Sequence, residues 1–274
     1  TITNMGTELG ATTSIFPSDE VTRKFLAAQG REGDYVPLSS DPDAEYDKII
    51  DINLSTLKPM IACPHSPDNV VAVETLKDVK VDQVCIGSCT NSSYEDITRA
   101  ASVAKQVLDN GLTLKTPLMV VPGSVRIFET LKRDGVLDVF EKLNATVLAT
   151  ACGPCIGQWH RTTGNPKVPN SIIESFNRNF AGRNDGSKKT NAFLASPEIV
   201  MAMAVEGDLT FNPLKDSVRG KNGMNYTLKV PQGEELPVKG FVKEVKGCIL
   251  PDYKKVEIKV SPDAERIRLL DPFP

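Results

Sequence analysis

Strand-like and helical segments alternate along the chain between residues 79 and 205. Apolar runs typical of strands cover 81–86, 118–121, 146–149 and 171–173, and helical spacing of apolar residues covers 97–108, 127–131, 136–143 and 197–205. Such alternation predicts an α/β fold with doubly wound, mainly parallel sheets. In these sheets the loops that follow the strands gather at one edge, which is where ligands bind.

Three predicted strands are followed by loops that contain cysteine or arginine. The loops are CIGSCTNSSYED (85–96), ACGPCIGQW (151–159) and NRNFAGR (177–183). Their convergence would place Cys89, Cys152, Cys155, Arg178 and Arg183 around one crevice. Three thiolates can ligate an iron–sulfur cluster while leaving one iron open, and two guanidinium groups suit an anionic substrate. We therefore predict a Lewis-acid cluster that acts on a polycarboxylate.

The first loop also carries a helix-start signal. Ser93 and Asp96 have the spacing of a capping box, so we expect a helix to begin directly after Cys89. Unpaired N–H groups at a helix N-terminus favour a thiolate. Asn91 would donate hydrogen bonds to the sulfides of a cluster held there.

Charge and cysteine content limit the classes of partner. The 274 residues carry a net charge of −3, which gives no electrostatic footprint for nucleic acid. No apolar stretch reaches the roughly 20 residues that span a bilayer, so we expect no membrane partner. A chain of this size does not need disulfides, and reduced thiols place it in a bacterial cytoplasm or a mitochondrial matrix.

The Cys-Gly-Pro-Cys sequence at 152–155 has two competing interpretations. Thioredoxin-like oxidoreductases use the same four residues after a strand. Against this, Trp159 follows the pair instead of preceding it, and a third cysteine and two arginines share the predicted crevice. A zinc site would need a further ligand, for which only His65 and His160 are available among the histidines. Cluster ligation is the interpretation that accounts for all of these residues.

Outside these loops the patterns predict structural roles. Cys63, Cys85 and Cys248 are expected to be buried as small hydrophobic side chains. Ser18 is expected to cap a helix that ends near Gly30, residues 49–54 alternate as a strand, and three prolines in 59–68 are expected to interrupt regular structure. Asn222 and Gly223 indicate a hairpin turn, with strands at 226–230 and around 256–260.

Several of these motifs also carry a family resemblance. The matching stretches are TITNMGTELGATTS (1–14), 86–96, 151–159, 177–185 and SPEIV (196–200), in family order along nearly the whole chain. On these residues the chain resembles the aconitase superfamily of iron–sulfur hydro-lyases, in particular its mitochondrial type. Asn191, where the family commonly has His, and Thr3, where it usually has Cys, are departures from the pattern.

The resemblance implies a role for each site residue. Cys89, Cys152 and Cys155 would ligate a 4Fe-4S cluster, with Asn4, Asn91 and Asn177 around it. Glu8 would act catalytically near the iron-bound hydroxyl, and Arg178 and Arg183 would bind the carboxylates of a tricarboxylate substrate. The implied reaction is the isomerisation of citrate and isocitrate through cis-aconitate.

The resemblance also implies that further domains are needed. Family members are longer, and their general base and acid come from last and first domains that this chain lacks, so we expect no hydratase activity from the chain alone. We expect 1–75 to be the end of a smaller α/β domain plus a linker, 76–210 the main α/β domain, and 211–274 a β-rich extension. A related dehydratase of homoaconitate, isopropylmalate or methylcitrate, and an RNA-binding role, remain alternatives.

Overall fold

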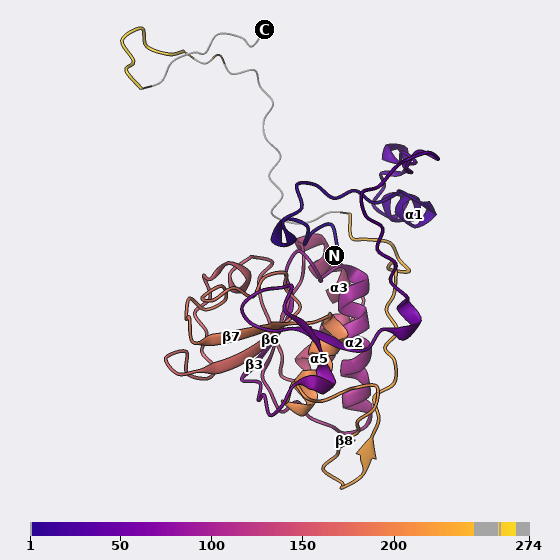
Figure 1. The fold of residues 1–274 in the computed structure, drawn as a ribbon, viewed down its shortest axis with the longest axis vertical. Helices are drawn as coiled ribbons and strands as arrows, with labels where there is room; N and C mark the ends of the chain where they lie inside the picture. Colours follow the sequence, from indigo (N-terminus) through magenta and orange to yellow (C-terminus); the bar gives the residue numbers. More distant parts are fainter. Residues whose placement is uncertain (1, 244–256, 258, 267–274) are drawn as a thin grey trace. The chain divides into compact units, whose positions relative to one another are not determined.

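Seven strands form one mixed sheet that organises the protein. Figure 1 shows β3, β6 and β7, which are neighbours in this sheet. The computed structural model describes residues 2–243, 257 and 259–266, and the chain divides into two compact units, Thr1–Lys243 and Glu244–Pro274. The sheet lies in the first unit, in the order β2-β1-β7-β6-β3-β4-β5. Its strands are β1 (Met60–Ala62), β2 (Val70–Ala72), β3 (Gln83–Gly87), β4 (Leu118–Val121), β5 (Thr146–Val147), β6 (Asn170–Glu174) and β7 (Thr190–Leu194).

The strand order reverses at β3. Strands β3 to β7 pair in parallel, whereas β1 pairs antiparallel with both β7 and β2. The chain runs from β3 to β4 and β5 on one side, then returns to β6 on the other side of β3 and continues to β7. The α/β class and the mainly parallel sheet are therefore confirmed. The junction of β3 and β6 is a topological switch point, the position at which parallel sheets bind their ligands.

Helices cover one face of this sheet. They are α2 (Tyr94–Asp109), α3 (Val125–Arg133), α4 (Val136–Glu141) and α5 (Pro197–Glu206). Because successive strand residues point to opposite faces, Val84 and Ile86 of β3 join the large helix-covered core while Cys85 points the other way. There Cys85 packs with Cys155 and Phe176. Segments that follow β5 and β6 thus cover the second face, and these segments carry the predicted site residues.

Capping residues in the sequence predicted where two of the helices begin. Ser93 and Asp96 form the predicted capping box of α2, and α5 begins with Pro197 in its first turn. Helix α1 (Glu20–Ala28) is also present, but the predicted cap is wrong by one residue. Asp19 is the N-cap and accepts a hydrogen bond from the backbone of Thr22, because Ser18 is engaged elsewhere, donating to the carbonyl of Val36 over 2.6 Å.

Strands were predicted less well than helices. The strand expected at 49–54 is absent, and the side chains of Ile49, Ile50 and Ile52 are exposed. Only a 3₁₀ turn, Leu54–Thr56, forms there, because no neighbouring strand pairs with this stretch. By contrast, β1 lies within the proline-containing stretch that was expected to interrupt structure, and β7 was not predicted. Further 3₁₀ turns are Thr7–Leu9, Glu32–Asp34, Val73–Thr75 and Pro154–Ile156.

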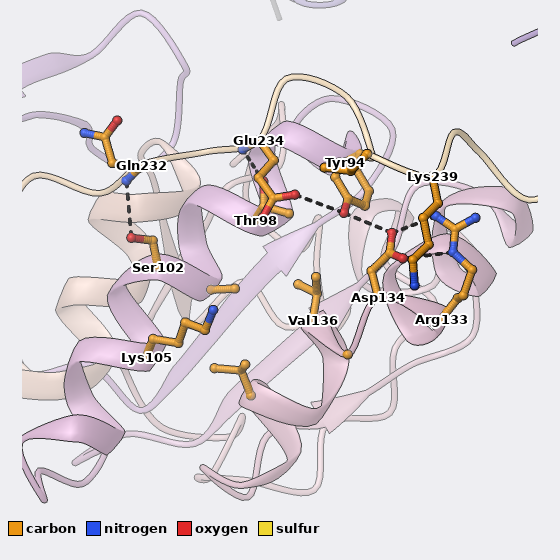
Figure 2. A pocket seen from close by; sticks show the side chains of 14 residues that line it. Tyr94, Thr98, Ser102, Lys105, Arg133, Asp134, Val136, Gln232, Glu234 and Lys239 are labelled. Carbon is orange, nitrogen blue, oxygen red and sulfur yellow. Dashed lines mark hydrogen bonds and ion pairs between the residues drawn. The ribbon is translucent and has the colours of Figure 1, made fainter. Parts of the chain in front are cut away.

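After α5 the chain forms a short hairpin and then a strap along α2. The hairpin joins β8 (Val218–Arg219) to β9 (Asn225–Tyr226) through the predicted turn, although β9 ends at Tyr226. We call residues 228–242 the strap. Side chains spaced along one side of α2 hold the backbone of the strap. Gln106 donates to the carbonyl of Lys229 and accepts from its N–H. Ser102 Oγ accepts from the N–H of Gln232 over 3.2 Å, and Thr98 Oγ1 accepts from the N–H of Glu234 over 2.9 Å (Figure 2).

Some predictions fall outside what the structure describes. Cys248 and two of the three residues expected on one face of a late strand, 256 and 258, lie outside the described residues. The division of the chain into parts at about 75 and 210 stays a prediction. In the part of the chain that is described, no helix combines the length and apolar character that crossing a bilayer requires.

Candidate functional site

The loop after β3 leaves the sheet through a tight turn at Gly87. Gly87 has φ of +137°, and a Cβ at this position would lie 2.1 Å from the carbonyl oxygen of Val121, so only glycine fits. Cys89 lies in the loop that follows and is exposed. Helix α2 begins only after its N-cap at Ser93, so the expectation that it begins directly after Cys89 is wrong. Cys89 therefore belongs to the loop itself and not to the first turn of the helix.

Hydrogen bonds join this loop to the one that follows β6. The N–H of Gly87 donates to Ser175 Oγ over 2.9 Å, and the amide of Asn91 donates to the carbonyl oxygen of Ser175 over 2.7 Å. Asn91 and Ser175 are both buried. The two loops that flank the switch point are thus fixed to each other, as the strand-end argument predicted.

The Cys152–Cys155 segment forms a turn that packs against the loop after β6. Cys152 is exposed, whereas Cys155 is 7% exposed and its thiol donates to Asn177 Oδ1 over 3.5 Å. A Cβ on Gly157 would lie 3.2 Å from the carbonyl oxygens of Gly182 and Arg183, so the turn approaches that backbone closely. We call residues 177–184 the arginine loop.

Burial and nearby polar groups shift the pKa of the Cys155 thiol in opposite directions. Burial raises the pKa of the Cys155 thiol, while the nearby hydroxyl of Ser88 and the positive charge of Arg183 act to lower it. The nearby carboxyl group of Glu174 acts to raise the pKa of Cys155 further. Cys155 therefore lies close to the β3 loop on one side and to the arginine loop on the other.

The three predicted cluster ligands do not form a ready metal centre. Among the residues that the structure describes, no three His, Cys, Asp or Glu side chains are grouped closely enough to hold a metal ion. The five cysteines described, at 63, 85, 89, 152 and 155, are all free thiols. Cys85 is buried as predicted, and Cys63 is half-buried. The predicted cysteine loops meet, but Cys152 remains at the surface of its turn.

Residues near the start of the chain lie against the same edge. The Glu8 carboxylate is 2% exposed, accepts a hydrogen bond from the amide of Asn177 over 3.2 Å, and forms an ion pair with Arg178. The amide of Asn4 donates to the carbonyl oxygen of Cys89 over 3.4 Å. Asn4 and Glu8 thus meet the β3 and arginine loops, and Arg178 is held by Glu8.

Buried polar atoms at this edge lack partners within the described part of the protein. They include Glu8 Oε2 near the start of the chain, and Asn179 Oδ1 and Arg183 Nε of the arginine loop. Buried polar atoms are normally hydrogen-bonded, so each of these atoms has capacity for a further polar partner. The three free thiols on the adjoining loops are of the donor type that an iron–sulfur cluster requires, and the unpaired N–H of Arg183 suits an anion.

Sequence reasoning missed two residues of this region. Glu174 at the end of β6 is fully buried, and burial raises its pKa well above the ordinary value. Asn184 is also buried and donates to Glu174 Oε2 over 2.5 Å. A glutamate inside an apolar strand was the available signal, because a buried carboxyl requires a specific partner.

A buried ion pair also lies beyond the arginine loop. Arg161 and Asp185 are 3.0 Å apart, with side chains 0% and 2% exposed. Arg161 further donates to Asn170 Oδ1 over 2.6 Å, at the opposite end of β6 from Glu174. This ion pair joins the segment after the Cys152–Cys155 turn to the end of the arginine loop.

Comparisons with known proteins agree with the motifs. A family model described as the aconitase family (aconitate hydratase) matches residues 1–207. The mitochondrial aconitate hydratase of Saccharomyces cerevisiae is 46% identical over 291 residues, covering 100% of this chain and 37% of that protein. The mitochondrial homocitrate dehydratase of the same yeast is 45% identical over 298 residues, with 38% of its length covered. The chain thus spans little more than a third of these relatives.

Proposed function

Since the chain belongs to the aconitase family, we propose that it forms the part of a hydro-lyase that holds a 4Fe-4S cluster and grips the carboxylates of the substrate. The observation that carries this proposal is the meeting of three segments at the switch point. Cys155 contacts Asn177, Asn91 contacts Ser175, and Asn177 contacts Glu8. Parallel sheets bind their ligands at this position.

Cys89, Cys152 and Cys155 would hold the cluster. Their loops adjoin, their thiols are free, and a movement of Cys152 alone, which is exposed at the start of its turn, would complete the set. When bound, the cluster would supply an open iron that acts as a Lewis acid on a hydroxyl group. Asn177 and Asn91, fixed by their contacts with Cys155 and Ser175, would orient the groups around it.

Arg178 and Arg183 would bind substrate carboxylates. Both belong to the arginine loop, and a guanidinium group matches a carboxylate with two parallel hydrogen bonds. Glu8 holds Arg178 through an ion pair, so it orients that guanidinium. Its carboxylate would then act near the hydroxyl of a bound substrate. Arg183 Nε is buried with no hydrogen-bond partner among the described residues, which leaves it available to an anion.

The reaction we propose is the hydration and dehydration of a tricarboxylate, with citrate, isocitrate and cis-aconitate as the first candidates. A homocitrate dehydratase is nearly as similar as the aconitate hydratases, so homocitrate is the second candidate. The names of these relatives favour a mitochondrial location. We expect no turnover by this chain alone, because the acid and base implied by the resemblance belong to other parts of the longer relatives.

The proposal is tested by substrate binding to anaerobically reconstituted protein. Citrate is expected to perturb the EPR spectrum of the cluster, and Arg183→Lys should weaken this effect about tenfold or more, because lysine keeps the charge but loses the fork. A spectrum that no tricarboxylate perturbs would contradict the function. Citrate turnover at the rate of a full-length enzyme would contradict only the expectation that the chain is inactive alone.

A further inference from the structure

We propose that Glu174 and Asn184 are positioning residues that fasten the Cys152–Cys155 turn to the arginine loop. The structural part of this inference rests on the contacts below. What the fastened turn would do, namely hold a cluster ligand at a set place relative to Arg183, rests on the function proposed above. Glu174 lies outside the motifs that pointed to the site, and Asn184 lies in the matching stretch 177–185 but was given no role there.

One side-chain amide makes the connection. Asn184 Nδ2 donates to Glu174 Oε2 over 2.5 Å and to the carbonyl oxygen of Pro154 over 3.1 Å. An amide nitrogen carries two hydrogens, so both are used. Asn184 directly follows Arg183, and Pro154 directly precedes Cys155. The side chain of Asn184 therefore ties the backbone of the Cys152–Cys155 turn to the end of β6, from the position next to Arg183.

The carboxyl group of Glu174 has no other hydrogen-bonding role among the described residues. Glu174 pairs in register with Cys85 and lies on the face opposite Ile173, in the layer that contains Met119 and Phe176. A carboxyl in an apolar layer is costly unless it is hydrogen-bonded. Its Oε1 has no partner, so the bond from Asn184 is the one contact that accounts for this residue.

The turn has little freedom to shift without disturbing this contact. Gly157 lies against the carbonyl oxygens of Gly182 and Arg183, and Cys155 donates to Asn177. The turn is thus held to the arginine loop at Pro154, at Cys155 and just beyond it at Gly157, whereas Cys152 at its other end is exposed. Removing the Asn184 amide should let Pro154 and Cys155 move relative to Arg183.

The variants separate positioning from general stability. Asn184→Ala removes both hydrogen bonds, and Glu174→Leu removes the acceptor of one. Glu174→Gln keeps a carbonyl oxygen for the amide and should behave as wild type. Asn170→Ala is the matched control: Asn170 is buried at the other end of β6, and its amide donates to Val168 over 3.0 Å and to Thr190 over 3.2 Å. This control also loses its bond with Arg161, so it destabilises the fold away from the turn.

The first measurement is Co²⁺ titration of the full chain, with thiolate-to-cobalt absorbance as the signal. Asn184→Ala should bind Co²⁺ roughly 10- to 100-fold more weakly, as expected when a partner that orients a metal ligand is lost. Glu174→Gln and Asn170→Ala should retain the affinity of the wild type. The inference is overturned if Asn184→Ala retains it too, or if Asn170→Ala loses it equally.

The second measurement needs no metal. The rate at which iodoacetamide alkylates Cys155 in the native chain should rise several-fold in Asn184→Ala and Glu174→Leu, but not in Asn170→Ala or Glu174→Gln, because only the first two release the turn. Equal rates in all five proteins would overturn the inference. If the wild type binds no Co²⁺ through its cysteines, the proposed function fails. The alkylation rates still decide whether Glu174 and Asn184 fasten the turn.

Discussion

The amide of Asn177 donates a hydrogen bond to the Glu8 carboxylate over 3.2 Å, although 169 positions separate the two residues. The same carboxylate oxygen pairs with Arg178, and the Glu8 side chain is 2% exposed. One buried carboxylate thus fixes the start of the chain to the arginine loop. It also makes the orientation of Arg178 depend on a segment far away in the sequence.

Glu8→Ala should therefore destabilise the protein. Removing the carboxylate leaves Asn177 and Arg178 without their acceptor, which should lower the free energy of unfolding by about 1–3 kcal/mol in urea denaturation. Glu8→Gln, which keeps an oxygen for Asn177 but removes the charge that pairs with Arg178, should cost less. Equal stability of the wild type and Glu8→Ala would mean that this contact does not hold the segment.

Gly87→Ala should destabilise the fold more than an ordinary glycine substitution does. The new Cβ would lie 2.1 Å from the carbonyl oxygen of Val121 on the neighbouring strand, at a φ of +137°. Overpacking and backbone strain together should cost about 3 kcal/mol or more. Gly223→Ala is the control, because φ is +79° there but no atom lies within 4 Å, so only strain of about 1 kcal/mol is expected. Similar urea midpoints for the two variants would contradict the close approach.

Because of Tyr94, the free energy of unfolding should fall as the pH rises above about 10. Its hydroxyl donates to Asp134 Oδ2 over 3.0 Å and lies 3.3 Å from Glu234 Oε2 of the strap (Figure 2). Burial, followed by the contacts with Asp134 and Glu234, raises the pKa of Tyr94 well above its ordinary value of 10.0. Above that pH the unfolded chain loses a proton that the folded chain keeps, so the free energy of unfolding should fall as pH rises.

Tyr94→Phe should remove this part of the pH dependence. At neutral pH the variant should lose about 1 kcal/mol with its hydrogen bond, and urea denaturation above pH 10 should give a shallower decline than in the wild type. Thr98→Val is the control, because it removes the bond to the N–H of Glu234 but no titrating group. An unchanged slope in Tyr94→Phe would show that another group titrates.

The sequence predicted those parts of the fold that depend on local patterns. Helix α2 follows from the capping box at Ser93 and from its apolar spacing, and both act within a few residues. Strands depend on distant partners: β7 forms because β6 offers a parallel edge, whereas residues 49–54 alternate correctly but meet no strand. Alternation alone therefore could not decide between the two.

The site was predictable as a set of loops but not as a set of contacts. The position of Cys89 and Arg178 after strands was enough to bring their loops to one edge. The bond between Glu174 and Asn184 depends on the path of the arginine loop back across the sheet, which no spacing encodes. The exposure of Cys152 depends in the same way on how its turn packs.

The most direct test of the account is anaerobic reconstitution with iron and sulfide, followed by iron analysis and EPR. The wild type and Cys63→Ala should take up a cluster, because Asn179 donates to the backbone carbonyl of Cys63, which alanine keeps. Cys89→Ala, Cys152→Ala and Cys155→Ala should each lose it. Full cluster content in any of these three variants, or equal loss in Cys63→Ala, would contradict the assignment of the ligands.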